Sequence, residues 1–223
     1  MKILKELISY IIIIIAALLI RTFIFTPVKV DGTSMVPTLH DSEILILKKY
    51  DKTYERFDIV DLTNYIANTY KDSQIVLFGI SMGAATVMNA SGEKLPKNVK
   101  AIIEDCGYTS TWNQFAYQLK ALFKLPAFPM MHAASIICKF RSGYFISEAS
   151  PIKQIKKSTT PTLFIHGDKD GFVPFFMLDK LYNASPVEKE KLIISGAKHA
   201  RASYVNPKLY WESIENFLNK YIN

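Results

Sequence analysis

Only two cysteines occur among the 223 residues, Cys106 and Cys138, and they form no Cys-x-x-Cys pair. This scarcity excludes a cysteine-rich zinc site and a dense disulfide framework. Both cysteines lie in apolar runs, which favours buried free thiols, while a disulfide between them stays open. No other motif implies a metal or a cofactor, so we expect neither.

The chain also lacks long runs of basic residues, although its net charge is +7. Residues 1–61 hold eight Lys/Arg and eight Asp/Glu, so residues 62–223 hold the other 19 basic and 12 acidic residues. No Lys/Arg run in this second part exceeds two residues. We therefore expect a solvated basic surface and no nucleic-acid partner, with attraction to an anionic membrane as the better alternative.

One long apolar run stands out against this polar background. Residues 7–25 carry a single charge, Arg21, and are about as long as the helix that crosses a bilayer core. Lys2 and Lys5 precede them, as expected for a cytoplasmic N-terminus. A cleaved signal peptide is the alternative, but no small-x-small cleavage site follows. We expect an uncleaved single-pass anchor in the cell membrane, with the C-terminal domain extracytoplasmic.

A short motif follows the apolar run. Residues 32–39 read Gly-x-Ser-Met-x-Pro-Thr-Leu, and residues 56–60 read Arg-Phe-Asp-Ile-Val. Residues 1–60 thereby resemble the start of bacterial type I signal peptidases. The resemblance implies that Ser34 corresponds to the nucleophile of that family, whose general base is a lysine in a later sequence box.

That later box, with its Gly-Leu-Pro-Gly-Asp-like sequence, is absent after Val60. Lys48, Lys49 and Lys52 belong to an earlier stretch and do not match the base. A Ser–Lys site needs a desolvated lysine within hydrogen-bond reach of the serine. We therefore interpret Ser34 as a vestigial nucleophile.

A second motif lies at residues 79–83, which read Gly-Ile-Ser-Met-Gly between a strand-like apolar run and an Ala-rich helix-forming segment. This strand–turn–helix setting is that of a nucleophile elbow. Ser81 would project from the sheet, and the backbone N–H of Met82 would face a developing oxyanion.

The later segments complete the pattern. His-Gly-Asp-Lys-Asp at residues 166–170 is followed by Gly-Phe-Val-Pro, and a strand-like run at 191–195 leads to His199. Residues 62–223 thereby resemble an α/β-hydrolase that lacks its first strands. The resemblance implies a Ser81–His199–Asp170 triad, with the acid at Asp170 and not Asp168, and a structural role for His166.

Three further elements fit this resemblance. Residues 99–105 have the composition of a strand, and residues 62–70 and 209–222 have helical spacing of their apolar side chains. Residues 108–147 form a long insert that is rich in aromatic residues and Met. The family places a lid or substrate pocket there, which implies an ester or acyl substrate; a helical core segment is the alternative.

The segment that precedes Ser81 is shorter than expected for this family. About 20 residues of hydrolase type lie between Val60 and Ser81, where four strands and an early oxyanion loop are expected. The edge of the nucleophile strand would then be open, and strand-like residues 43–47 and 58–60 are candidates to cover it. The sequence indicates a junction of two truncated proteins near residues 60–62.

We predict an α/β fold: a partial α/β-hydrolase sheet with flanking helices over residues 62–223, after a transmembrane helix within 1–25 and a short β-rich segment at 26–61. The first functional hypothesis is a membrane-anchored serine hydrolase that acts on ester, acyl or peptide substrates. The second is a signal peptidase-like protein without its base, and the third is a catalytically silent fusion. The oligomeric state is left open.

The anchor hypothesis gives the first prediction. If residues 7–25 form an uncleaved transmembrane anchor, full-length protein stays with the membrane pellet after a carbonate wash, because carbonate strips only peripheral proteins. Release of full-length protein into the supernatant would disprove the anchor.

Overall fold

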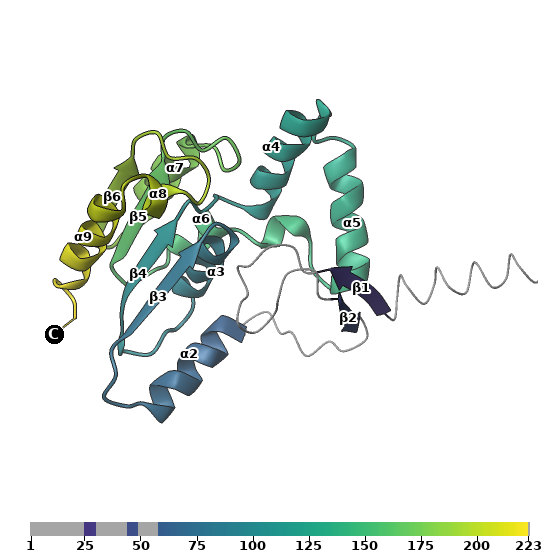
Figure 1. Cartoon of the computed structure of the whole chain (residues 1–223). Coiled ribbons are helices and arrows are strands. Elements are labelled where there is room, and N and C mark those ends of the chain that lie inside the picture. Colours follow the sequence, from purple (N-terminus) through teal and green to yellow (C-terminus); the bar gives the residue numbers. More distant parts are fainter. Residues whose placement is uncertain (1–24, 30–43, 49–57, 223) are drawn as a thin grey trace, which may run out of the picture. The chain divides into compact units, whose positions relative to one another are not determined.

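The computed structural model describes residues 25–29, 44–48 and 58–222 (Figure 1). The chain divides into two units, Met1–Arg56 and Phe57–Asn223. In the first unit, β1 (Phe25–Lys29) and β2 (Ile44–Lys48) pair in antiparallel register. Ser34 and residues 7–24 of the expected anchor lie outside the described residues, and Phe25, the last residue of that anchor, begins β1. None of the helices within the described ranges is both long and apolar enough to cross a bilayer.

The second unit is built on a parallel sheet in the order β3-β4-β5-β6. Its strands are β3 (Ile75–Ile80), β4 (Val99–Asp105), β5 (Thr162–Gly167) and β6 (Lys189–Ile194). The central strands β4 and β5 are buried along almost their whole length, as expected for parallel strands that are covered on both faces. The helices are α2 (Asp58–Thr69), α3 (Met82–Ser91), α4 (Thr111–Phe123), α5 (Met130–Ser142), α6 (Pro151–Ile155), α7 (Phe176–Ala184), α8 (Ala202–Val205) and α9 (Pro207–Leu218), with a 3₁₀ turn η1 (Ile146–Glu148).

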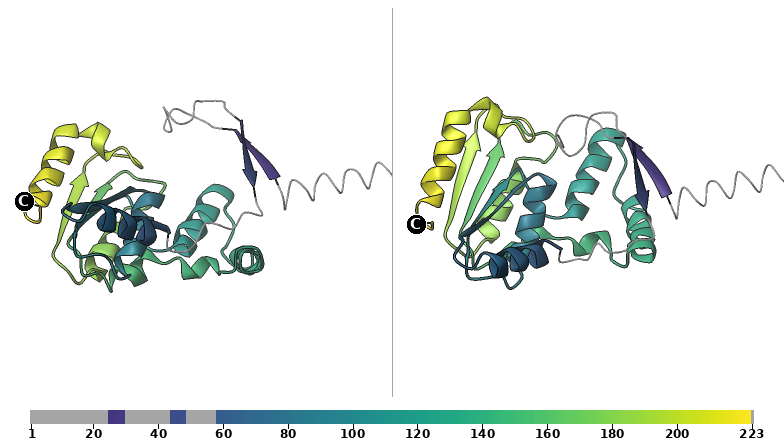
Figure 2. Two further views of the ribbon diagram at one scale, coloured as in Figure 1. Left: turned by 90° about the horizontal axis from the view of Figure 1, so that it is seen from below. Right: turned by 60° about the horizontal axis from the view of Figure 1, so that its bottom comes forward.

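Helices cover both faces of this sheet (Figure 2). On one face, Ile103 and Ile165 pack against Tyr210 and Phe217 of α9. On the other face, Phe164 packs in a cluster that includes residues of α3, α6 and α7. The two buried layers make β4 and β5 the rigid centre that carries the loops at the carboxyl edge.

Most elements agree with the sequence-based predictions, but residues 58–60 do not. They were expected as a strand and instead form the first turn of α2, in which Thr63 Oγ1 donates to the Ile59 carbonyl at 2.6 Å. The apolar residues of Asp58–Thr69 recur at helical spacing, and this period overrides the strand propensity of an Ile-Val pair. Residues 44–48 form a strand as expected, but it pairs with β1 in a separate sheet.

The edge of β3 that faces away from β4 has no strand partner among the described residues. Phe78 and Ile80 on this strand are each 43% exposed, although β4 beside it is almost fully buried. This agrees with the expectation that the nucleophile strand has lost its usual neighbour. The carboxyl end of β3 is nevertheless held by β4, because the Ser81 N–H donates to the Asp105 carbonyl at 2.8 Å.

A buried carboxyl group lies at the end of β4. Burial raises the pKa of Glu104 from its ordinary 4.5 to about 8; a hydrogen bond from the Gly107 N–H opposes this shift, and the charge of Asp105 adds to it. The Gly107 bond measures 2.9 Å to Oε2, while Oε1 is buried without a protein partner. Glu104 therefore keeps its proton at neutral pH in the folded chain.

This shift predicts a loss of stability at rising pH. Between pH 4.5 and about 8 the unfolded chain releases the Glu104 proton and the folded chain retains it, so the free energy of unfolding falls by up to about 5 kcal/mol. In Glu104→Gln this contribution is absent. The difference in thermal midpoint between variant and wild type should grow in favour of the variant from pH 5 to pH 8.

The matched control is Glu215→Gln, which removes an exposed carboxylate from α9. It should leave the pH dependence of the thermal midpoint unchanged. Parallel pH profiles for Glu104→Gln and wild type would show that Glu104 is ionised in the folded chain.

Candidate active site

Ser81 occupies the tight turn between β3 and α3. It has φ 56° and ψ −113°, a backbone conformation that L-residues seldom adopt. Ser81 stands at the N-cap position of α3, yet its side chain makes no capping hydrogen bond. The hydroxyl points instead to His199, which leaves the first N–H groups of α3 without a side-chain acceptor.

The turn depends on a close approach of two backbones. A Cβ on Gly79 would lie well inside van der Waals contact with the carbonyl group of Gly83 and the amide of Ala84. A Cβ on Gly83 would meet nothing within 4 Å. The two glycines of the motif therefore differ: Gly79 is required by packing, and Gly83 is not.

The structure brings Ser81, His199 and Asp170 together from three separate loops at the carboxyl edge of the sheet. Ser81 Oγ lies 2.8 Å from His199 Nε2, and His199 Nδ1 lies 2.7 Å from Asp170 Oδ2. The Asp170 side chain is fully buried, whereas the His199 side chain is 23% exposed. A proton can therefore pass from the serine to an imidazole that the carboxylate orients.

The Asp170 carboxylate is held by more than His199. Oδ1 accepts the N–H groups of Phe172 and Val173, each at 2.9 Å, and His166 Nε2 lies 3.3 Å from Oδ2 and 3.0 Å from the Val173 carbonyl. Burial raises the pKa of Asp170, but the hydrogen bonds from His166, His199 and Val173 outweigh it and bring the pKa below its usual range. Asp170 is thus ionised at neutral pH, and the buried His166 helps to fix it.

Asp168 has a different position. Its two oxygens accept the Gly196 N–H at 2.7 Å and the Ser195 hydroxyl at 3.1 Å. A Cβ on Gly167 would overlap the Ala197 carbonyl, so the end of β5 and the loop after β6 are in close contact. Asp168 and Gly167 therefore fix the loop that carries His199 and do not contact the imidazole.

Sequence reasoning missed Phe172 and its link to the insert. The Phe172 ring lies over His199, with ring centroids 4.7 Å apart. Its carbonyl accepts hydrogen bonds from Gln114 at 2.7 Å and Gln118 at 2.6 Å, both on α4. The sequence feature that could have revealed this link is the pair of glutamines at i and i+4 on α4, which share one helix face. Only the fold shows what these side chains contact.

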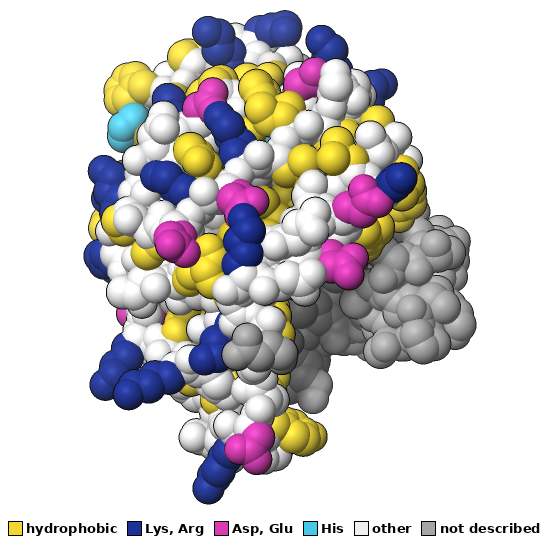
Figure 3. Space-filling model, turned by 90° about the vertical axis from the view of Figure 1, so that its left-hand side faces the viewer, with side chains coloured by type: hydrophobic (Ala, Val, Ile, Leu, Met, Phe, Trp, Pro, Cys, Tyr) yellow, Lys and Arg dark blue, Asp and Glu magenta, His cyan; other side chains and the backbone are white. Residues whose placement is uncertain are grey.

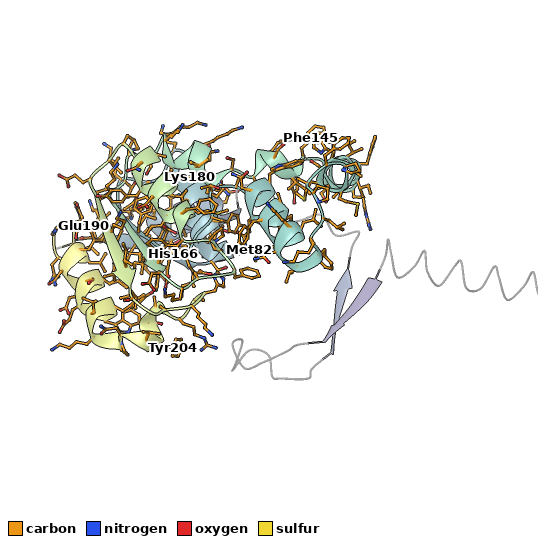
Figure 4. The ribbon with its side chains drawn as sticks, turned by 90° about the horizontal axis from the view of Figure 1, so that it is seen from above. Met82, Phe145, His166, Lys180, Glu190 and Tyr204 are labelled. Atoms are coloured by element: carbon orange, nitrogen blue, oxygen red, sulfur yellow. The ribbon has the colours of Figure 1, made fainter. Side chains whose placement is uncertain are left out.

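Met82 begins α3 directly after Ser81 and is 72% exposed. Figure 4 shows Met82 and His166 on the sheet-bearing part of the chain and Phe145 apart from it, on the insert. The insert contains a cavity of about 400 Å³, lined by Trp112, His132, Ser135, Ile136, Phe145 and Ser147. No residue of the triad lines this cavity.

The residues at the site fit a metal poorly. Donor atoms of Cys106, Asp170 and His199 lie within 4.8 Å of one another. Burial raises the pKa of the Cys106 thiol, and the charge of Asp105 raises it further, so the thiolate that a metal requires is disfavoured. The Asp170 and His199 donor atoms already bond to each other. Both cysteines are free, with Cys106 buried and Cys138 half-buried.

Comparisons with known proteins agree with the two-part sequence. Residues 45–223 match the prolyl oligopeptidase family, and residues 3–79 match the family described as signal peptidase, peptidase S26. The uncharacterized protein YqkD of Bacillus subtilis is 30% identical over 74% of this chain and 55% of its own length. Signal peptidase I of Bacillus licheniformis is 53% identical over 23% of this chain and 30% of its own length.

The fold has solved counterparts. A Pyrococcus furiosus esterase superposes with a TM-score of 0.55 at 21% identity, over 75% of this chain and 63% of that one. Fold and family together define the class, a protein with an α/β-hydrolase-like fold. Within this class the chain belongs to the prolyl oligopeptidase family, preceded by a segment similar to the start of signal peptidase I. The chain spans about half the length of YqkD.

The asymmetry of the two glycines gives a prediction. Gly79→Ala should lower the free energy of unfolding by at least about 3 kcal/mol, because its methyl group would overlap the backbone of α3. Gly83→Ala adds a methyl group in open space inside a helix and should be neutral or stabilising by up to about 1 kcal/mol. Denaturant unfolding of the two variants measures both values. Equal effects would show that Gly79 and Gly83 do not have the asymmetric packing described here.

Proposed function

We propose that this chain is a membrane-anchored serine hydrolase that cleaves ester or amide bonds, with Ser81 as nucleophile, His199 as general base and Asp170 as the orienting acid. The observation that carries this proposal is the unbroken hydrogen-bonded series from Ser81 Oγ through His199 to Asp170, at 2.8 and 2.7 Å. The backbone conformation of Ser81 supports it, because such conformations concentrate at functional sites.

The reaction would follow the geometry. His199 Nε2 takes the Ser81 proton as Oγ attacks the substrate carbonyl, and the ionised Asp170 stabilises the imidazolium. The Met82 N–H, at the uncapped start of α3, donates to the oxyanion. His199 then gives its proton to the leaving group, and a water molecule activated by His199 releases the acyl group from Ser81.

The substrate class is an ester or acyl compound, or a peptide. The family name points to peptide bonds, and the apolar insert beside the Asp170 loop favours an acyl group. Turnover should be low, because within residues 58–222 we assign one oxyanion donor, the Met82 N–H, where the family uses two. The loss of one such donor costs on the order of 10²–10³ in turnover. The open edge of β3 would loosen the position of Ser81 further.

Residues 7–25 would anchor this enzyme in the cell membrane, with the N-terminus in the cytoplasm and residues 62–223 outside it. The support is the apolar length of the segment and its basic N-terminal flank. A second candidate function is signal-peptide cleavage at Ser34, which the similarity of residues 3–79 to signal peptidases favours. The absence of the base lysine from its expected box speaks against it.

The assignment of the nucleophile is testable with a fluorophosphonate probe and peptide mapping on detergent-purified protein. We expect label on Ser81 in wild type and in Ser34→Ala, and none in Ser81→Ala. Hydrolysis of a short acyl ester should be weak and close to the rate of Ser81→Ala.

Two results would count against this proposal. Label on Ser34 that persists in Ser81→Ala would assign the nucleophile to Ser34 in the first unit. Efficient cleavage of a signal-peptide substrate would support the same assignment. Efficient ester turnover that vanishes in Ser81→Ala would keep Ser81 as nucleophile but show that another group replaces the missing oxyanion donor.

A further inference from the structure

The insert between β4 and β5 folds into a helical hairpin whose apolar side chains face solvent. We define the hairpin as residues 111–147, which include α4 and α5 (Figure 1). Among the described residues, 24 large hydrophobic side chains are exposed, and 11 of them lie in this hairpin. Leu122, Phe123, Phe128 and Phe140 are each at least 66% exposed. Clusters of this size on a protein surface mark a binding surface.

The charges of the hairpin have a single sign. Lys120, Lys124, Lys139 and Arg141 are exposed, and residues 106–147 contain no Asp or Glu; the first acidic residue after them, Glu148, lies 3.8 Å from Lys139. Elsewhere the signs are mixed: Lys220 pairs with Glu190 at 2.6 Å, and Figure 3 shows basic and acidic side chains interleaved on the face of the chain that carries α9. The hairpin therefore combines an apolar surface with a predominantly basic one.

This combination of apolar and basic side chains indicates which partner binds the hairpin. Helices with aromatic and aliphatic residues on one face and Lys or Arg beside them bind the interface of anionic bilayers. A second copy of the hairpin would bring the same four positive charges opposite one another, which disfavours self-association through this surface. A bilayer that contains anionic phospholipid satisfies both the apolar and the basic side chains.

The hairpin is also connected to the triad. Gln114 and Gln118 of α4 donate to the carbonyl of Phe172, and the Phe172 ring contacts His199. The exposed apolar residues Leu122 and Phe123 lie at the other end of the same helix. A lipid surface bound there would lie about one helical turn beyond Gln118, which bonds to the loop that holds Asp170.

We propose that the α4–α5 hairpin docks on the surface of an anionic phospholipid bilayer, with its exposed aromatic and aliphatic side chains in the interface and its Lys and Arg side chains at the headgroups. This docking surface is independent of residues 7–25 and of Ser81 chemistry. The hairpin would bind the bilayer surface whether or not the first unit spans the bilayer.

A local probe of lipid contact tests this proposal on the full chain. Cys138 is replaced by Ser, buried Cys106 is kept, and an NBD fluorophore is attached at Ala133→Cys on α5 or, as the matched control, at Asn216→Cys on α9; both positions are exposed. Protein is reconstituted in vesicles of phosphatidylcholine with or without phosphatidylglycerol. Nitroxide groups on the lipid acyl chains should quench the probe at 133, only in the anionic vesicles, and spare the probe at 216.

A charge variant completes the test. Replacement of Lys120, Lys124, Lys139 and Arg141 by Gln should weaken insertion of the probe at 133 by on the order of 10²–10³-fold, since each basic residue contributes near an anionic surface. Replacement of the exposed residues Lys156, Lys157, Lys180 and Lys208 by Gln changes the net charge by the same amount and should not alter insertion of the probe at 133. Thermal unfolding checks that both variants are folded.

The other occupants give different results. A probe at 133 that is shielded from water but not quenched by lipid nitroxides would mean that protein covers the hairpin, either a second copy or residues 1–56, and would overturn the proposal. So would quenching that does not depend on phosphatidylglycerol, or a water-exposed probe in all vesicles.

Discussion

The contact between the backbones of Gly79 and Gly83 is the constraint on which the site depends. Because Gly79 has no Cβ, α3 can begin directly above the end of β3, and the chain must turn through Ser81 with φ at 56°. That turn directs the serine hydroxyl away from the N-terminus of α3 and toward His199. One close approach thus sets the position of the hydroxyl and leaves the helix N–H groups free of side-chain caps.

The partners of Ser81 are positioned by the same kind of local packing. Gly167 lets the loop after β6 approach the end of β5, and Asp168 ties the two segments through the Gly196 N–H. Asp170 is then fixed by two backbone N–H groups and by His166. Since these bonds all favour the ionised carboxylate, the pKa of Asp170 stays low despite its burial.

The apolar surface of the chain lies in two places with different physical causes. On β3, Phe78 and Ile80 are exposed because the described sheet ends at that strand. On the hairpin, the apolar residues are exposed because α4 and α5 extend from the sheet and pack only partly on each other, leaving a cavity beside Trp112. The first surface lies near the end of the segment that matches signal peptidases, and the second lies entirely within the segment that matches the prolyl oligopeptidase family.

The sequence by itself determined the local elements and the identity of the candidate triad. The apolar run of residues 99–105 is a strand, and the Gly-x-Ser-x-Gly turn joins a strand to a helix, because period and turn chemistry are local properties. Where two local signals competed, at residues 58–60, the strand prediction was wrong, since the helical period of the longer segment prevailed. Only the tertiary structure decided that Gly79 and not Gly83 is sterically required, that His166 bonds to Asp170, and that Phe172 joins α4 to His199. These contacts join residues far apart in the chain or on different elements, and their distances depend on how the strands and helices pack, which no sequence period encodes.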